Sequence, residues 1–422
     1  MTVKHTIQVL LGEFHDNLNA LSTFVPRIAR FPDAPNKIKV AIGMRRAGKT
    51  YFLYQYILQL LEQQIPLTRI LYLNFEDDRL FPLDAQKLAG LLEAFYSLYP
   101  ENHDHKCYLF LDEIQNVEEW PRVIRRFHDS KKVEIFLTGS SAKLLSKEIA
   151  TSLRGRSLST EIWPYSLNEY MQAKGAEISS ALFDKKTEDK LTQVFNEYLR
   201  EGGFPEVVSY TPEIRQKTLQ EYVDVVSYRD IIERHLISNT TLIKYMIIAM
   251  IHNAASSFSI NKFYNDLKSQ GYKLNKDTLY EYASHIEDAY LAFSLPVYSE
   301  SLRKTQVNPK KIYAVDTGII NAMTLNHTGN FGRLFENIVY LDLRRQGYKV
   351  HYYLTEQRYE VDFLVENWQG QKKLLQAVWS IEDPKTLARE TRALEQAQKE
   401  LALPGEIITL ASYLESRGQI FV

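Results

Sequence analysis

The sequence has little of several features that would assign a chain to a particular class. It contains one cysteine, Cys107, which excludes a framework of disulfide bonds and favours a reducing compartment. Its 51 lysines and arginines balance 52 aspartates and glutamates, so binding of a polyanion would depend on local patches. The longest uninterrupted apolar run, residues 245–251, is too short to cross a bilayer. Low-complexity tracts and internal repeats are also missing.

The N-terminal stretch carries acidic residues and lacks the long apolar core of a signal peptide. We therefore expect a cytoplasmic protein that has no membrane partner. With 422 residues, the chain is long enough for about three domains with ample cores.

The stretch that organises the sequence, residues 37–54, contains the pattern G-x-x-x-x-G-K-T. Alternating apolar residues before the pattern predict a buried strand, and the apolar spacing after it predicts a helix. A glycine loop between a strand and a helix presents backbone N–H groups and the helix dipole to phosphate groups. We predict that Lys49 neutralises the β- and γ-phosphates of ATP and that Thr50 ligates Mg²⁺. The residues expected to bind the nucleotide are Gly43, Arg45, Arg46, Ala47, Gly48, Lys49, Thr50 and Tyr51.

An apolar run that begins at Cys107 ends in two adjacent carboxylates, Asp112 and Glu113. After a phosphate loop, the first is expected to hold the Mg²⁺ shell beside Thr50, and the second to polarise the attacking water. The alternative is a core strand that ends in a solvated acidic turn.

Hydroxyl and guanidinium groups follow at the ends of two later predicted strands. Ser140 and Ser141 stand at the start of a predicted helix, where their hydroxyls would sense the γ-phosphate or cap the helix. Arg154 and Arg156 precede the fifth predicted strand at the outer edge of the sheet. From there either arginine would reach the γ-phosphate of a neighbouring subunit as an arginine finger supplied in trans. The alternative is that both arginines are only solvated.

These parts, in this order, resemble the AAA+ ATPases, and within them a prokaryotic group with the motifs G-x-R-R-x-G-K-T, L-D-E-I-Q and T-G-S-S. The motifs stand here at residues 43–50, 111–115 and 138–141. The resemblance implies a three-layer α/β domain over residues 1–163 with sheet order 5-1-4-3-2, and a helical lid over residues 164–239. The phosphate loop predicts ATP and Mg²⁺ as ligands, and an arginine finger in trans predicts a homo-oligomer that is a hexameric ring or a smaller head-to-tail assembly.

The predicted lid has one landmark of its own. Gly202 and Gly203, ahead of Pro205, predict a helix end with a tight turn. The spacing leaves open whether an arginine of the lid touches the nucleotide; the candidates are Arg200, Arg229 and Arg234.

From about residue 240 the pattern changes to three predicted helices followed by two short β-like runs. This order outlines a winged helix-turn-helix over residues 240–320, whose third helix, residues 276–288, would lie in the major groove of DNA. The third helix is more acidic than most recognition helices, so contact with a protein and a purely structural role are the alternatives. The side chains expected to contact DNA are Lys276, Arg303, Lys304, Lys310 and Lys311.

Residues 321–422 predict the element order α-β-β-β-α-β, with Glu336 on the helix and Asp362 on the second strand. This order is similar to the PD-(D/E)XK nuclease core, which holds Mg²⁺ between the strand aspartate and an acid on the next strand. Here Gln376 and Val378 stand where that acid and a lysine belong. Because an amide is a weak Mg²⁺ ligand and valine cannot activate water, we expect a degenerate, catalytically silent site. The alternative is that the two acids are ordinary surface residues.

The sequence thus predicts an ATP-hydrolysing AAA+ motor or switch that binds and remodels a macromolecule, with DNA as the expected partner. One alternative is a nucleotide-dependent protein-remodelling or regulatory ATPase with protein partners. A second alternative is a metal-dependent DNA nuclease.

Overall fold

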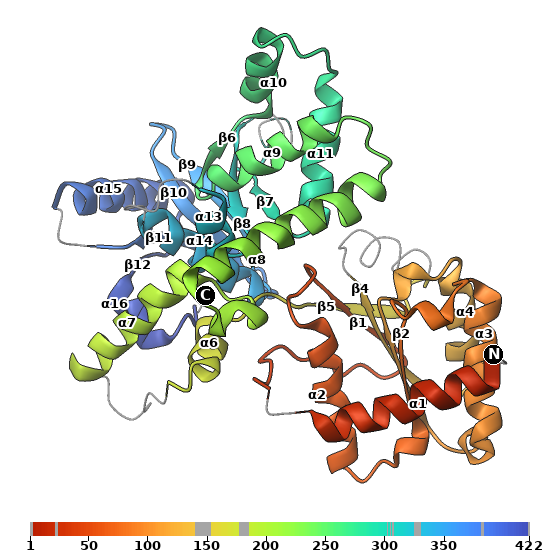
Figure 1. The fold of residues 1–422 in the computed structure, drawn as a ribbon. Helices are drawn as coiled ribbons and strands as arrows, with labels where there is room; N and C mark the ends of the chain where they lie inside the picture. The colour runs from red at the N-terminus through yellow and green to blue at the C-terminus, as the bar shows by residue number, and fades with distance from the viewer. Residues whose placement is uncertain are drawn as a thin grey trace. The chain divides into compact units, whose positions relative to one another are not determined.

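A computed structural model describes residues 3–21, 24–139, 153–176, 185–301, 303, 305, 308–324, 331–380 and 384–420. The chain divides into two units, residues 1–162 and 163–422, and Figure 1 shows their elements. Within the described ranges, no helix has both the length and the apolar character that a membrane span requires.

The first unit is organised around a five-stranded parallel sheet in the order β2-β3-β4-β1-β5 (Figure 1). The predicted order 5-1-4-3-2 is therefore confirmed. Every residue of the two strands that lead into the candidate site, β1 and β3, is buried, as expected for strands of a sheet covered on both faces. The strands are β1 (Ile38–Ile42), β2 (Ile70–Asn74), β3 (Cys107–Asp112), β4 (Val133–Gly139) and β5 (Ser157–Glu161).

Aromatic side chains from helices and strands form much of the core of this unit. Phe14 of α1 and Phe52 of α2 are buried in one apolar cluster with Phe110 and Phe136 of the sheet. The rings of Phe110 and Phe136 stack with their centroids 4.5 Å apart. The helices of the unit are α1 (Val3–Ala20), α2 (Lys49–Glu62), α3 (Ala85–Leu98) and α4 (Trp120–Ser130), with 3₁₀ turns η1 (Leu67–Arg69), η2 (Asp78–Leu80), η3 (Pro100–His103) and η4 (Ile114–Asn116).

The segment predicted as a lid, residues 164–239, is helical in its described parts and belongs to the second unit. Two of its helices pack on a short helix from much later in the chain, α13 (Thr317–Met323). The role of this segment as a lid stays a prediction. Its elements are α6 (Leu167–Ala173), α7 (Lys185–Glu201), η5 (Pro205–Ser209), α8 (Pro212–Val225) and the π-helical η6 (Val226–Glu233).

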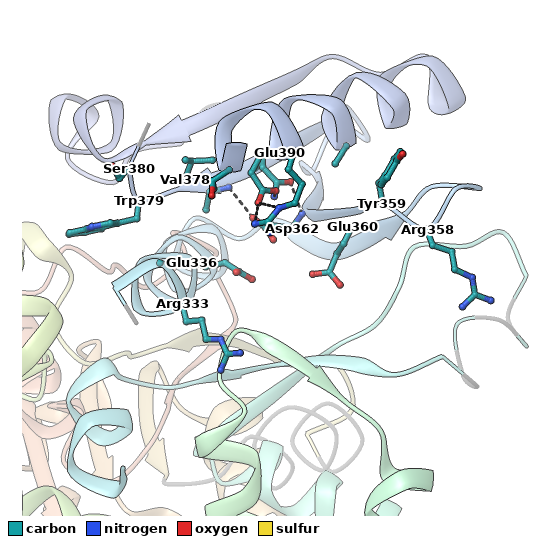
Figure 2. Close-up of a pocket in the computed structure, with 16 residues that line it drawn as sticks. Arg333, Glu336, Arg358, Tyr359, Glu360, Asp362, Val378, Trp379, Ser380 and Glu390 are labelled. Carbon is teal, nitrogen blue, oxygen red and sulfur yellow. Dashed lines mark hydrogen bonds and ion pairs between the residues drawn. The ribbon is translucent and has the colours of Figure 1, made fainter. Parts of the chain in front are cut away.

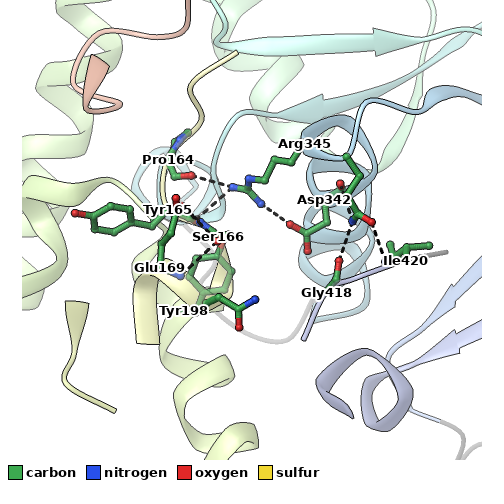
Figure 3. Close-up of polar contacts among 12 residues, drawn as sticks. Pro164, Tyr165, Ser166, Glu169, Tyr198, Asp342, Arg345, Gly418 and Ile420 are labelled. Atoms are coloured by element: carbon green, nitrogen blue, oxygen red, sulfur yellow. Dashed lines mark hydrogen bonds and ion pairs between the residues drawn. The ribbon is translucent and has the colours of Figure 1, made fainter. Parts of the chain in front are cut away.

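Arg345, whose side chain is 14% exposed, ties the first residues of the second unit to helix α14 (Phe331–Arg345), as Figure 3 shows. The guanidinium of Arg345 donates to the carbonyl oxygens of Pro164 at 3.1 Å and Tyr165 at 3.3 Å. It also pairs with Asp342 at 2.6 Å. The Tyr198 hydroxyl of α7 donates to the same Tyr165 oxygen at 2.7 Å. These bonds join α7, α14 and the segment before α6 into one body.

The next part of the second unit contains three helices and a three-stranded antiparallel sheet in the order β6-β8-β7. The predicted third helix, residues 276–288, has the bounds of α11. The structure adds a short strand, β6, that the sequence did not indicate. The winged helix-turn-helix itself stays a prediction. The elements are α9 (Thr240–His252), β6 (Ser256–Phe258), α10 (Ile260–Ser269), α11 (Lys276–Asp288), β7 (Ala292–Leu295) and β8 (Lys310–Ala314).

The C-terminal part has the element order that the sequence predicts, with an added last helix, around a four-stranded sheet in the order β12-β11-β10-β9. Strands β9, β10 and β11 are antiparallel, and β12 runs parallel to β11. Helix α15 packs on this sheet through Leu394 and Ala397, which lie in one cluster with Leu364 and Leu374. After α14 the elements are β9 (Lys349–Leu354), β10 (Glu360–Glu366), β11 (Lys372–Val378), α15 (Pro384–Leu401), β12 (Gly405–Thr409) and α16 (Leu410–Ser416).

Candidate functional site

The predicted phosphate loop connects β1 to α2, and its shape depends on glycine at two positions. Gly43 has φ 150°, and a Cβ added there would lie 2.2 Å from the backbone oxygen of Ile162. Because glycine has no side chain, the end of β1 can lie close to Ile162, the residue that follows β5. Gly48 has φ 95°, in the left-handed region that side chains disfavour, and helix α2 begins directly after it. The loop therefore reaches the N-terminal end of a helix, where backbone N–H groups are available to an anion.

Lys49 lies inside this loop and is 4% exposed. Its ammonium group donates to the backbone oxygens of Gly43 at 3.2 Å and Met44 at 3.1 Å. It also lies 3.7 Å from a carboxylate oxygen of Glu113. The ammonium group is thus held between the phosphate loop and the acidic end of β3.

Asp112 is the centre of a group of hydroxyls. Thr50 donates to its Oδ2 at 2.7 Å, and Tyr72 of β2 donates to the same oxygen at 2.9 Å. Thr138 of β4 donates to its Oδ1. Burial, with the neighbouring charge of Glu113, raises the pKa of Asp112, and the hydroxyl bonds offset part of that shift. The carboxylate is therefore fixed beside Thr50 in a place where its negative charge is costly.

Glu113 directly follows β3 and has φ 54°, a strained value for a residue with a side chain. Two bonds support this conformation: its backbone N–H donates to the Thr138 hydroxyl at 2.9 Å, and its carboxylate accepts from the Gln115 amide. The predicted pair, Asp112 and Glu113, therefore lies beside the predicted loop residues Lys49 and Thr50.

Three residues that support the site were not in the predicted set. The roles of Thr138 and Tyr72 follow from the sheet order, which places β2 and β4 on either side of β3. Arg27 donates to the backbone oxygen of Ala47 at 2.7 Å and is 6% exposed, so the segment before β1 holds the phosphate loop. The T-G-S-S motif was a usable signal for Thr138, but the sequence carries no comparable signal for Arg27.

The other predicted residues of this site are more peripheral in the structure. Arg45 pairs with Glu76 at 2.8 Å, and Tyr51 is 51% exposed. Arg156 pairs with Asp129 of α4 at 3.0 Å, while Arg154 is exposed. Ser140 and Ser141 lie outside the described residues.

The oxygen atoms at the site suit Mg²⁺ bound together with a nucleotide. In the part of the chain that the structure describes, no group of three or more carboxylate, imidazole or thiolate side chains is arranged to hold a metal ion. Thr50 and Asp112 instead offer one hydroxyl and one carboxylate. Mg²⁺ is commonly bound by one or two such protein oxygens, with phosphates and water completing its shell.

The predicted residues of the degenerate nuclease site also come together, in the second unit. Glu336 of α14 and Asp362 of β10 line a pocket of about 620 Å³ with Gln376 of β11 (Figure 2). The Gln376 amide accepts from the backbone N–H of Asp362 at 3.1 Å and donates to Glu390 at 2.6 Å. Both ends of this amide are therefore satisfied within the protein.

The prediction that Lys311 contacts DNA is wrong. Lys311 lies on β8, the middle strand of its sheet, and its side chain is 2% exposed. Its ammonium group pairs with Glu336 at 2.6 Å and with Asp362 at 2.9 Å, so it points into the protein. Lys276, Arg303 and Lys310 keep exposed surface, and Lys304 lies outside the described residues.

With this geometry in place, comparison with known proteins identifies the family. A family model described as an AAA domain matches residues 35–171. An uncharacterised protein of Methanocaldococcus jannaschii is 38% identical over 385 residues, which cover 90% of this chain and 82% of that protein. The chain belongs to this AAA-domain family. An uncharacterised protein of Haemophilus influenzae is 31% identical over 342 residues, which cover 81% of this chain and 82% of that protein.

The rest of the chain matches two family models described as domains of unknown function, over residues 192–330 and 331–408. Among solved structures, the Walker-type ATPase of Pyrococcus abyssi aligns with a TM-score of 0.44 at 15% identity, over 72% of this chain and 99% of that one. The Orc1 protein of Aeropyrum pernix, solved in complex with DNA, aligns with a TM-score of 0.32 at 12% identity, over 68% of this chain and 86% of that one. The predicted AAA+ family is confirmed, and the PD-(D/E)XK assignment stays a prediction.

Proposed function

We propose that this AAA-domain protein is an ATP-hydrolysing motor or switch that binds and remodels a macromolecule, and that the macromolecule is DNA. One observation supports the ATPase part above all others. The Thr50 hydroxyl lies 2.7 Å from Asp112, and Lys49 lies 3.7 Å from Glu113, so the four residues with assigned roles in hydrolysis form one site.

Each of these residues has a distinct role in the proposal. Lys49 and the N–H groups at the start of α2 bind the phosphates, while Thr50 and Asp112 hold Mg²⁺. When bound, Mg²⁺ supplies positive charge that offsets the charge developing on the phosphate oxygens. A phosphate that attracts Lys49 draws it away from Glu113, whose carboxylate is then available to accept a proton from water.

Two substitutions test the ATPase proposal. Lys49→Ala removes the buried ammonium, and we expect it to abolish ATP binding in a titration with a fluorescent ATP analogue. Glu113→Gln keeps the shape of the side chain but cannot accept a proton. It should bind ATP like the wild type and release phosphate about 100-fold more slowly or worse. Glu118→Gln, on an exposed residue nearby, is the control and should hydrolyse ATP normally. Unchanged phosphate release by Glu113→Gln would refute the assignment of the base.

The proposal includes an assembly in which Arg154 or Arg156 completes the site of a neighbouring chain. Exposed Arg154 fits that role better than Arg156, because Asp129 already pairs with the Arg156 guanidinium. A site completed in trans makes the hydrolysis rate per chain rise with protein concentration until assembly is complete. A rate per chain that does not depend on concentration would contradict this part of the proposal.

The DNA partner is supported by cationic side chains around α11 and the strands that follow it. Lys276 stands at the first position of α11, and its ammonium lies over the Tyr280 ring, 5.7 Å from the centroid. Tyr280 is itself 40% exposed, so a cation and an aromatic ring face solvent together. Arg303 and Lys310 add positive charge from the β7–β8 connection and from β8. Such groups would contact phosphates rather than read bases.

An exposed apolar row favours a second candidate, a protein-remodelling ATPase. Ile214 and Val225 are exposed on α8, three helical turns apart and so on one face of the helix. Tyr228 and Leu236 are exposed further along the chain, and Leu236 is 89% exposed. Four large apolar side chains exposed along residues 214–236 are candidates for contact with a protein, which would bury them. The salt dependence of binding distinguishes the two candidates.

A further inference from the structure

The ammonium group of Lys311 lies among three carboxylates. It is 2.6 Å from an oxygen of Glu336, and 2.9 Å from oxygens of both Glu360 and Asp362. The carboxylates come from α14 and β10, whereas the lysine comes from β8. An almost completely buried cation is thus surrounded by hard oxygen atoms from two other elements.

Hydrogen-bond donors around this cluster favour the ionised form of its carboxylates. The Tyr313 hydroxyl donates to Glu336 at 2.7 Å, and the backbone N–H of Ala377 donates to the second oxygen of Asp362 at 3.1 Å. Burial and the charge of Asp362 raise the pKa of Glu336 to about 7. Burial opposes the charge on Lys311, yet Asp362 and its neighbours hold the pKa of Lys311 well above its usual range. The three carboxylates therefore need a cation between them, and the lysine supplies it.

With the ammonium in place the three carboxylates are not arranged to hold a metal ion, but one oxygen of each converges on the ammonium nitrogen. Their distances of 2.6 to 2.9 Å from one point are slightly longer than the 2.3–2.6 Å typical of Ca²⁺, and well beyond the 2.0–2.1 Å of Mg²⁺. Glu336, Glu360 and Asp362 line the open 620 Å³ pocket, as Figure 2 shows, so an ion would reach them from solvent.

We propose that the ammonium of Lys311 is the resident cation of this carboxylate cluster and stands where a divalent metal ion would otherwise bind. It follows that the native cluster takes up no metal, and that a neutral residue at position 311 turns the cluster into a Ca²⁺-type site. This inference does not depend on the ATPase proposal. The predicted lack of nuclease activity would then have a second cause, in addition to the presence of Gln376 where the nuclease fold carries an acid.

Lys311→Met tests the inference through stability. The substitution leaves buried Asp362 and its two neighbouring carboxylates without their cation, so the thermal unfolding midpoint in EDTA should fall by several degrees. Ca²⁺ should restore part of the loss of the midpoint, and the effect should saturate as the Ca²⁺ concentration rises, while the wild-type midpoint stays unchanged.

Lys310→Met, on the neighbouring residue outside the cluster, is the control. In Lys311→Met/Asp362→Asn the response to Ca²⁺ should disappear. A Lys311→Met midpoint that is the same in EDTA and Ca²⁺ would overturn the inference.

A measurement on the native lysine keeps the test decisive if Lys311→Met does not fold. Tb³⁺ resembles Ca²⁺ and emits when a nearby tyrosine is excited, and the Tyr313 hydroxyl is 2.7 Å from Glu336. We expect equal Tb³⁺ emission from the wild type and from Glu360→Gln, both without nucleotide, because Lys311 already fills the cluster. Wild-type emission clearly above that of Glu360→Gln would show that the native cluster binds a metal ion, and the inference would be wrong.

Discussion

Asp112, at the candidate nucleotide site, carries a charge that its proposed role requires and that lowers the stability of the folded protein. Its pKa is raised in the folded protein, so the fold binds this proton more tightly than the unfolded chain does. The contribution of Asp112 to stability therefore falls as pH rises from the ordinary carboxyl pKa through the raised one. At neutral pH the charged carboxylate destabilises the nucleotide-free protein, although the proposed binding of Mg²⁺ needs that charge.

Asp112→Asn should separate the two effects. We expect it to raise the unfolding midpoint of the nucleotide-free protein at pH 7 by a few degrees, because the buried charge is gone and a polar amide replaces it. The gain should shrink as pH is lowered through the raised pKa of Asp112, where the aspartate of the wild type takes up a proton. Phosphate release should fall at least about 100-fold. Thermal unfolding as a function of pH measures the first effect, with Asp78→Asn at an exposed carboxyl as the control. A lower midpoint for Asp112→Asn at pH 7 would contradict the account.

At this scale the sequence predicts residues whose chemistry is tied to a local pattern, and misses residues that depend on tertiary neighbours. Lys49, Thr50, Asp112 and Glu113 come together as expected because their motifs end two strands of one parallel sheet. The support from Arg27 arises only when the segment before β1 folds against the loop. The error at Lys311 has the same origin. A lysine beside other cationic residues is typical of a surface position. The neighbouring sequence does not indicate that three carboxylates from α14 and β10 surround it.

At the scale of elements, the bounds of α11 follow from apolar periodicity, whereas the order of the parallel sheet was implied by the resemblance to the AAA+ ATPases. Strand β6 was missed because its three residues are too few to show a period. The packing of the predicted lid helices on α13 could not be predicted either. Periodicity indicates which face of a helix is apolar, but it does not indicate which later helix will cover that face.

The turn between α7 and η5 provides a prediction at this scale. A Cβ on Gly203 would lie 2.4 Å from the backbone oxygen and 2.9 Å from the backbone nitrogen of Tyr165. Because both neighbours are backbone atoms, Gly203→Ala must displace the segment that Arg345 holds. We expect it to lower the free energy of unfolding by about 2–4 kcal/mol, measured by urea denaturation. Gly332→Ala in α14 is the control, since a Cβ there meets nothing within 4 Å and should cost nothing. Equal stabilities for the two variants would show that the turn tolerates a side chain.

For the whole molecule, the net charge of −1 does not identify a partner, so the distribution of charge must do so. If Lys276, Arg303 and Lys310 contact phosphates, the logarithm of the binding constant for duplex DNA should fall with the logarithm of salt concentration at a slope of about −3. Lys276→Ala should reduce the magnitude of that slope by about 1 and weaken binding to all sequences equally. Lys217→Ala, at an exposed lysine on α8, should change neither quantity.

Fluorescence anisotropy with a labelled duplex, at 50 to 200 mM salt, measures this slope, and phosphate release with and without the same duplex measures coupling to hydrolysis. Steep salt dependence together with DNA-stimulated hydrolysis supports the DNA motor. A shallow slope that Lys276→Ala leaves unchanged, with no stimulation by DNA, would remove DNA from the proposal. The apolar row from Ile214 to Leu236 would then direct the search to a protein, whose binding should weaken on Leu236→Ser but vary little with salt. The two outcomes depend on different physical terms, counterion release in the first case and burial of apolar surface in the second.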